Sequence, residues 1–385
     1  MTEQGFEEIR CYNDSEVSGA LERLVSEDVF LKMLNVLFPH LSTQQIVDQL
    51  LGYQTIIDFQ KGFVNRFLLG LEATITKGIS MYGLDKIDTS KAQLYISNHR
   101  DIILDSAFLC TKLLENNLNT VEIAIGDNLL VFPWISDLVR VNKSFIVRRG
   151  LSSRQILESS ELLSKYIAFT LQGKQQSIWI AQREGRAKDS NDTTQESLLK
   201  MFNMYGKDDL ITNLIRLNIC PLCISYEYDP CDFLKAKEFQ LKRDIANYAK
   251  KPQDDLINMQ TGVMGYKGKV VYQLTGNIET ELKLIAAKRL SKNEQIHEIA
   301  LLIDRRIHAG YSIFNNNRIA YDLLKSEARF ANEYTSADVN EFEAYIVKQI
   351  SKIEIANKDN EFLRIKLLEM YANPLINKLI AIDEE

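Results

Sequence analysis

One of the four histidines stands in a segment that could supply a general base. Residues 97–105 read Ser-Asn-His-Arg-Asp-Ile-Ile-Leu-Asp, so two carboxylates, Asp101 and Asp105, follow His99 closely. A neutral imidazole can take a proton from an alcohol when a carboxylate holds its other ring nitrogen and fixes the tautomer. The segment could therefore activate a hydroxyl group. Taken alone, the same residues are also typical of a capped helix start.

Two later segments place basic side chains directly after short apolar runs. Residues 143–150 read Lys-Ser-Phe-Ile-Val-Arg-Arg-Gly, and residues 178–188 read Ile-Trp-Ile-Ala-Gln-Arg-Glu-Gly-Arg-Ala-Lys. Arginine guanidinium groups grip phosphate through paired hydrogen bonds, and a glycine lets the backbone turn. Two basic loops at strand ends would suit one phosphate group. Either segment alone is more typical of a solvated charged turn.

The elements that must position these residues alternate between β-like runs and helical stretches. The runs are 79–82, 94–97, 121–125, 144–147, 178–181, 220–226 and 269–274, and the helices expected between them include 103–116, 152–172 and 194–204. Such alternation predicts an α/β fold, a sheet flanked by helices. His99 then lies at a strand-to-helix turn, where α/β folds carry reactive groups.

Both ends of the chain have helical patterns. Residues 14–77 predict several helices, with boundaries near 38–40 and 51–53 and a helix cap within 41–45. After residue 280 a helical pattern returns and ends in an amphipathic stretch from about Ala337 to Tyr371, expected to pack as a surface helix. We therefore divide the chain into an N-terminal helical segment at 1–77, an α/β domain at 78–280 and a C-terminal helical region at 281–385.

The bulk composition argues against several classes of protein. A net charge of −6 on 385 residues makes a nucleic-acid partner unexpected. The longest apolar runs, such as 129–135, fall well short of the roughly 20 residues that span a bilayer, and the acidic amino terminus lacks a signal-peptide pattern, so we expect a cytoplasmic protein. Five cysteines fit reduced thiols, and Cys220 and Cys223 are interpreted as buried strand residues rather than half a zinc site.

Four segments, in this order, resemble the blocks of the glycerol-phosphate acyltransferase superfamily, specifically its bacterial glycerol-3-phosphate and 1-acylglycerol-3-phosphate O-acyltransferase-like branch. They are His99-Arg100, then 124–129 followed by 145–149, then 183–188, and finally 219–227. The resemblance covers about residues 78–280. It implies a mixed sheet flanked by helices, with the helical segments at both ends as additions.

The resemblance also implies roles for individual residues. His99 would be the general base that deprotonates the acceptor hydroxyl as it attacks an acyl thioester. The side chains that would bind the acceptor's phosphate or shape its loops are Lys143, Arg148, Arg149, Glu184, Gly185, Arg186 and Lys188, and Pro221 would help form the acyl-binding wall. No metal or other cofactor is implied, because the acyl donor, acyl-coenzyme A or an acyl carrier protein, is a co-substrate.

The spacing of the carboxylate departs from the family's pattern. The family has four residues between the histidine and the aspartate, but Leu104 stands at that spacing here and Asp105 lies one residue further on. Asp105 could reach the imidazole if the turn carries an extra residue, and Asp101 could do so from the turn itself. We favour Asp105, because Leu-Asp-Ser-Ala-Phe-Leu then falls in step with the family's helix.

The implied partners are a thioester donor, a phosphate-bearing lipid precursor and the cytoplasmic face of a membrane. Residues 131–135 are apolar and aromatic with basic residues nearby, so they could enter the lipid interface, although buried core is an equal interpretation. Two rival functions remain. One is acyl transfer to a lyso-aminolipid or another hydroxyl compound, and the other is lipid binding by a relative that lost activity through the shifted aspartate.

Overall fold

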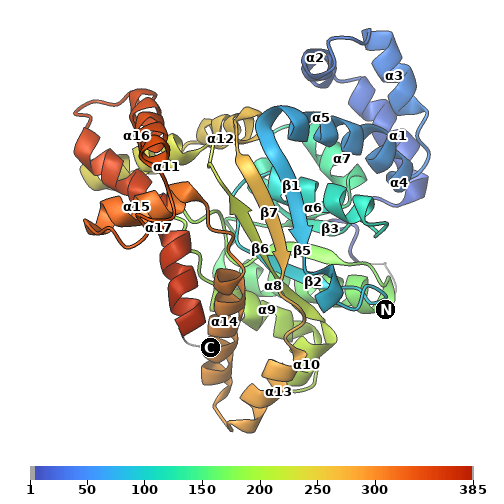
Figure 1. Cartoon of the computed structure of the whole chain (residues 1–385). Coiled ribbons are helices and arrows are strands. Elements are labelled where there is room, and N and C mark those ends of the chain that lie inside the picture. Colours follow the sequence, from blue (N-terminus) through green and yellow to red (C-terminus); the bar gives the residue numbers. More distant parts are fainter. Residues whose placement is uncertain (1–4, 384–385) are drawn as a thin grey trace.

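A mixed sheet of seven strands forms the centre of the molecule (Figure 1). The structure, a computed structural model, describes residues 5–383 except the side chain of Pro252. The strands are β1 (Thr76–Tyr82), β2 (Leu94–Ser97), β3 (Glu122–Gly126), β4 (Ser144–Val147), β5 (Ile178–Ala181), β6 (Ile219–Tyr226) and β7 (Gly268–Leu274). Their order is β1-β7-β6-β2-β5-β3-β4. The five strands from β6 to β4 are parallel, and β7 pairs antiparallel with β6 and parallel with β1.

Both faces of the central strands β2 and β6 are buried, which explains their nearly unbroken apolar runs, whereas only Ile79 is buried on the edge strand β1. Side chains alternate between the two faces, so Leu94 and Ile96 join one hydrophobic cluster while Tyr95 joins the other. The first cluster is covered by α8 (Ser153–Ala168), α9 (Glu196–Phe202), α10 (Leu210–Arg216), α13 (Glu279–Ala287) and α14 (Lys292–Ala309). The second is covered by α5 (Asn65–Ile75) and α6 (Leu104–Glu115).

The N-terminal helices form a separate hydrophobic cluster at one end of the sheet (Figure 1). They are α1 (Asp14–Val25), α2 (Asp28–Leu37), α3 (Thr43–Leu51) and α4 (Ile56–Phe59), which continues through the π-turn η1 (Gln60–Val64) into α5. The cap expected within 41–45 is present, because the Ser42 hydroxyl accepts from the Gln45 amide and the Gln45 side chain accepts from the Ser42 amide. Their core includes Val141 at the end of α7 (Pro133–Val141), which ties them to the sheet domain.

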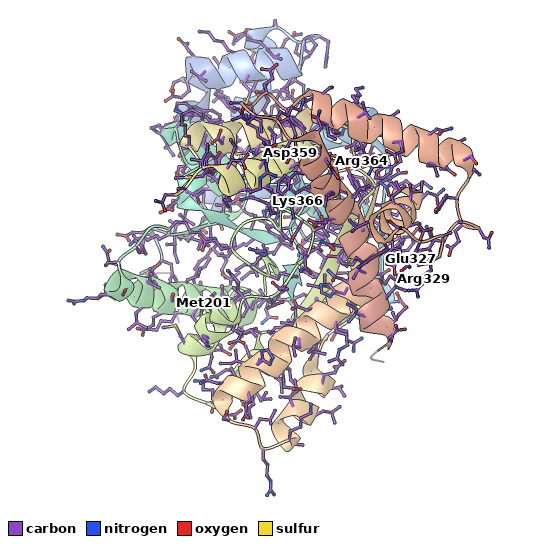
Figure 2. All side chains as sticks on the ribbon, turned by 90° about the vertical axis from the view of Figure 1, so that its left-hand side faces the viewer. Met201, Glu327, Arg329, Asp359, Arg364 and Lys366 are labelled. Carbon is purple, nitrogen blue, oxygen red and sulfur yellow. The ribbon has the colours of Figure 1, made fainter. Side chains whose placement is uncertain are left out.

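The C-terminal helices pack around the last helix. They are α15 (Asn315–Lys325), α16 (Ser336–Ser351) and α17 (Asn360–Asp383), and they share a core with α11 (Asp232–Asp244), which precedes α12 (Pro252–Met264). Figure 2 shows α17 along this side of the molecule, with Arg364 and Lys366 labelled. Arg364 pairs with Glu343 of α16 at 2.5 Å. Among the described residues, no helix combines the length and the apolar character that a membrane crossing requires.

The predicted elements agree closely with the structure. All seven β-runs are strands, and the predicted helices correspond to α6, to α8 with the π-turn η4 (Phe169–Gly173), and to α9 with the 3-10 turn η5 (Asn203–Tyr205). The prediction of one long surface helix from Ala337 to Tyr371 was wrong. That stretch is α16 and part of α17, separated by a loop in which Asn357 has the left-handed φ of 51°. The face of α17 that packs against α15 is buried core rather than surface.

Candidate active site

His99 lies just beyond the carboxyl end of β2, where the loops of the parallel strands gather. Asn98 continues the sheet for one more residue through its side chain, which donates to the Ile224 carbonyl and accepts from the Ile224 amide, both at 2.8 Å. The side-chain amide thus replaces a backbone partner on β6 and fixes the turn. Asn98 is fully buried, so both of these hydrogen bonds are shielded from water. The next residue, His99, is thereby directed out of the sheet edge.

Of the two carboxylates that the sequence left open, Asp105 is the one beside the imidazole. Asp105 Oδ2 lies 2.8 Å from His99 Nδ1 and also accepts the backbone N–H groups of Arg100 and Asp101, at 2.6 and 3.0 Å. Asp105 is fully buried, whereas the His99 side chain is 13% exposed. An oxygen that accepts from two amides also accepts from the ring, so Nδ1 carries the hydrogen. The lone pair is then on Nε2, which has no hydrogen-bond partner within residues 5–383.

Asp101 serves a different purpose at the start of α6. Its Oδ1 accepts the backbone N–H groups of Ile103 and Leu104, both at 2.9 Å, and so caps the helix that carries Asp105. Burial raises the pKa of the Asp101 carboxyl, and the neighbouring Lys267 ammonium opposes this effect. A Cβ atom at Gly262 of α12 would come within 2.4 Å of Asp101 Oδ2, so α12 approaches this carboxyl closely.

Three further side chains fix the surroundings of the imidazole. The indole of Trp179 on β5 donates to the Ser97 hydroxyl at 2.9 Å, and its ring meets the His99 ring edge to face with centroids 5.6 Å apart. Tyr272 on β7 donates to the Asp105 carbonyl at 2.8 Å. The imidazole is therefore held by packing on one side and by a carboxylate that the helix and sheet both position.

Arg100, the residue after the histidine, belongs to a network of three buried polar side chains. The Arg100 guanidinium is 5% exposed and lies 2.7 Å from Asp192 Oδ2, an atom that also accepts the Tyr311 hydroxyl at 2.6 Å. Arg100 donates in turn to the Tyr311 hydroxyl oxygen at 2.9 Å. Burial lowers the pKa of Arg100, but the Asp192 carboxylate more than offsets this, so Arg100 stays charged. The network joins the β2 turn to the loop after β5 and to the end of α14.

The helices of the C-terminal region hold this loop at several other points. The amide and hydroxyl of Thr194 both donate to Asp304 of α14, at 2.7 and 2.6 Å. From α17, Asn373 donates to the Asp189 carbonyl at 2.8 Å, and Asn377 donates to the Asn191 side chain at 3.2 Å. The loop from the third block is thus braced by residues more than 100 positions away.

The basic residues after β4 and β5 lie at the same edge as His99 but point to different partners. Arg148 pairs with Glu8, and Arg149 pairs with Glu184 at 3.0 Å, which links the two loops. Gly185 has a φ of +69°, a left-handed conformation that L side chains rarely adopt, so it does shape the third loop. These ion pairs are partly exposed, and such pairs contribute little to stability. They remain available to exchange partners with a ligand.

Deeper in the third block, Arg186 and Lys188 face the helices that follow β6. Arg186 donates to Asn258 of α12 at 2.8 Å, and Lys188 pairs with Glu238 of α11. The Nη1 atom of Arg186 and the Nε atom of Arg183 are buried without a hydrogen-bond partner among the described residues. Buried donors without partners are uncommon in folded proteins. They mark this part of the edge as a place where an anion could complete the hydrogen bonding.

Two predicted site residues lie elsewhere. The placement of Lys143 at the phosphate site was wrong, because Lys143 precedes β4 and therefore lies at the opposite edge of the parallel sheet from residues that follow the strands. Its ammonium donates to Gln176 at 3.2 Å, and burial lowers its pKa. Pro221 lies inside the sheet on β6, opposite Ile96, and its role in acyl binding stays a prediction. Cys220 and Cys223 are buried on the same strand, as predicted.

Sequence reasoning missed several residues that position the site. Asn98 carried one signal in the sequence, because an asparagine directly after an apolar β-run can pair with the neighbouring strand through its side-chain amide. Trp179 was read only as part of a β-run. Asp192 and Tyr311 carried no local signal, since they meet Arg100 only through the tertiary fold. Among the described residues, no group of three or more histidine, cysteine or acidic side chains is placed to hold a metal ion.

Part of the chain is similar to known proteins. Residues 78–225 match the family model named Acyltransferase. The crystal structure of the 1-acyl-sn-glycerophosphate (LPA) acyltransferase PlsC from Thermotoga maritima is similar at 10% sequence identity, covering 74% of this chain and 91% of that chain with a TM-score of 0.34. No curated protein sequence matches the chain. The matched residues include His99, Asp105 and the basic loops after β4 and β5.

Proposed function

We propose that this protein is an O-acyltransferase of phospholipid synthesis. It moves a fatty acyl chain from a thioester, acyl-coenzyme A or an acyl carrier protein, to the hydroxyl of glycerol 3-phosphate or 1-acylglycerol 3-phosphate. The observation that carries this proposal is the buried contact between His99 and Asp105, which leaves His99 Nε2 open at the loop edge of the sheet. The match of this segment to an acyltransferase model supports it.

In the proposed reaction His99 acts as a general base. Nε2 takes the proton of the acceptor hydroxyl as its oxygen attacks the thioester carbon, and a tetrahedral intermediate forms. The carbon–sulfur bond then breaks, and the leaving thiolate takes the proton back from the imidazolium. Asp105 stabilises the imidazolium between these steps, because its charged oxygen already faces Nδ1 at 2.8 Å. At the end of the cycle the imidazole of His99 is neutral again.

The phosphate of the acceptor is proposed to bind among the basic residues of the second and third blocks. The unpartnered Nη1 of Arg186 and Nε of Arg183 support this placement, because an anion would satisfy both buried donors. Arg149 is close enough to the third loop to pair with Glu184 and could exchange this carboxylate for a phosphate. A local cluster of cations is needed, because the protein as a whole has a net charge of −6.

The direct test is an acyl-transfer assay with the purified full chain. Labelled acyl-coenzyme A and acyl carrier protein are offered with glycerol 3-phosphate, 1-acylglycerol 3-phosphate and a lyso-aminolipid. We expect transfer to a phosphate-bearing acceptor that His99→Ala abolishes. His297→Ala is the matched control, because His297 is an exposed histidine on α14. Transfer only to the lyso-aminolipid would refute a phosphate-bearing acceptor and identify a lyso-aminolipid in its place. Lipid binding without transfer to any acceptor would refute the enzymatic proposal.

Contact with a membrane surface is the second part of the proposal. Val131 and Phe132 are 38% and 44% exposed, in the loop between η3 (Asp127–Leu129) and α7. Phe132 stacks on Trp134 with centroids 6.4 Å apart, and Trp134 packs on Phe30 of α2. An exposed, braced aromatic residue can enter a lipid interface without unfolding the protein. The fraction of protein that floats with anionic liposomes should be lower for Phe132→Ser than for wild type, while the melting temperature stays the same. An unchanged fraction would refute this contact.

A further inference from the structure

A cavity of about 580 Å³ lies between the C-terminal helices and the end of β7. Cavities of this size typically hold small-molecule ligands. Thr275, at its border, donates to the Pro221 carbonyl on β6, and none of residues 97–105 or 183–188 lines the cavity. The C-terminal half of α17 forms one wall, beside α14 in Figure 1. This cavity is therefore separate from the candidate active site.

One wall of the cavity carries positive charge that the described residues do not fully compensate. Four cations line it, and two of these have carboxylate partners: Arg318 pairs with Glu333 at 2.7 Å, and Arg306 pairs with Glu281. The ammonium of Lys378 instead donates to the backbone carbonyl of Tyr311 at 2.6 Å. The fourth cation, Lys86, is exposed at the rim.

The environment of Lys378 is unfavourable for a cation without a counter-ion. Burial lowers the pKa of this ammonium, the Cys223 thiol opposes that effect, and the positive charge of Arg318 adds to it. A half-buried charge without an ionic partner is costly, and proteins usually supply one. An anion in the cavity would supply it here. Lys378 points toward this space, since it lines the cavity and contacts its floor at Tyr311.

The rest of the α17 wall, on either side of Lys378, is apolar. Leu375, Leu379 and Ile382 follow one another at helical spacing along α17, so they form a single stripe, and Ile313 and Phe330 complete the wall. Ile382 is 44% exposed although it belongs to this stripe. The cavity thus offers a cationic end and an apolar side that the described chain does not cover.

We propose that this cavity binds a single-chain anionic amphiphile, with its head group at Lys378 and its alkyl chain along the stripe of α17. The shared chemistry fits both a fatty carboxylate and an alkyl phosphate monoester. The site is independent of acyl transfer, because no residue of the His99 turn lines it. Its occupant would rest against Tyr311, whose hydroxyl holds Arg100 on the other side.

Calorimetric titration of the full chain tests the proposal without relying on turnover. The probes are dodecanoate, dodecyl phosphate, neutral dodecyl maltoside and inorganic phosphate, each below its micelle concentration. We expect binding of one or both anionic alkyl probes, weakened about tenfold or more by Lys378→Gln and by Leu379→Ser, and retained in Lys378→Arg. Lys366→Gln, on the same helix but paired with Glu369, is the matched control. The two anionic probes distinguish a carboxylate from a phosphate head group.

Binding at the candidate active site must be separated from binding in the cavity. Arg186→Gln should leave the Lys378-dependent component unchanged. The proposal is refuted if Lys378→Gln and Leu379→Ser leave binding of the anionic probes intact, or if dodecyl maltoside binds as tightly. Glu384 and Glu385 follow α17 outside the described residues. Binding that appears only after both are changed to glutamine would show that the chain's own end fills the cavity, which also refutes the proposal.

Discussion

The substitution Asp105→Asn separates the charge of this residue from its geometry. Asp105 Oδ2 accepts three hydrogen bonds, and two of them come from the backbone amides of Arg100 and Asp101, which can only donate. An asparagine must therefore place its oxygen at this position, because its NH₂ group would face two donors. His99 Nδ1 would keep its hydrogen and its acceptor, and Nε2 would stay the free base. The negative charge would be lost, and the NH₂ group would take the buried position of Oδ1, which has no hydrogen-bond partner among the described residues.

The size of the effect follows from this geometry. A hydrogen bond to a charged group contributes about 1.5–3 kcal/mol and a neutral one about 1 kcal/mol, so the imidazolium loses about 0.5–2 kcal/mol of stabilisation. That corresponds to a loss of roughly 2- to 30-fold in kcat/KM. An asparagine that forces the wrong tautomer costs about 10⁴-fold in the serine proteases. We therefore expect Asp105→Asn to stay clearly more active than His99→Ala.

The assay is steady-state acyl transfer with whichever acceptor the wild-type protein uses, together with a melting curve for each variant. Asp101→Asn is the matched control, because its oxygen can still cap α6, and its kcat/KM should fall less than about threefold. A loss of 10³-fold or more in Asp105→Asn would refute the argument about the tautomer. Near-normal turnover in Asp105→Asn with an inactive Asp101→Asn would overturn the assignment of Asp105 as the partner of His99.

Three further predictions concern stability. Asn98→Ala should lower the free energy of unfolding by about 2–4 kcal/mol in urea titrations, because the buried amide and carbonyl of Ile224 lose their partners; a change below about 1 kcal/mol would contradict this role. Burial raises the pKa of Asp232 to about 7, so the folded state keeps a proton that the unfolded state loses above pH 4, and this carboxyl lowers stability as the pH rises from about 4 to 7. The free energy of unfolding of Asp232→Asn should therefore exceed that of wild type by about 4 kcal/mol more at pH 8 than at pH 4, and an equal difference at both pH values would refute this linkage. Gly185→Ala should cost about 1 kcal/mol from its positive φ, with Gly185→Asn closer to wild type, and equal melting temperatures for all three proteins would count against a strained turn.

The sequence predicted the strands well because each is a short apolar run between polar turns. Runs such as 94–97 and 178–181 coincide with β2 and β5, since a strand buried on both faces needs no other signal. The amphipathic pattern from Ala337 to Tyr371 wrongly predicted one continuous helix, because helical periodicity continues across the loop that separates α16 from α17. A signal was present there in Asn357, a residue that tolerates the left-handed conformation.

The candidate site was predictable only where its residues are close in sequence. His99 and Asp105 lie in one turn, so their residue types suggested a pair, but Asp101 was an alternative and the choice of Asp105 depended on the resemblance to the family's helix. Lys143 was misplaced because it precedes its strand, and in a parallel sheet residues before and after a strand lie at opposite edges. Tyr311 could not be foreseen, because its contact with Arg100 arises from the packing of α14 on the sheet.

The hydrogen bonds between α17 and the loop after β5 can form only late in the synthesis of the chain. Asn373 and Asn377 hold Asp189 and Asn191, and these contacts cannot form until the ribosome has made the last helix. At typical synthesis rates that is roughly ten to forty seconds after the loop itself. A nascent chain would have its histidine and aspartate long before its third block is fixed. The loop after β5 in an unfinished chain would therefore lack the two hydrogen bonds that α17 supplies.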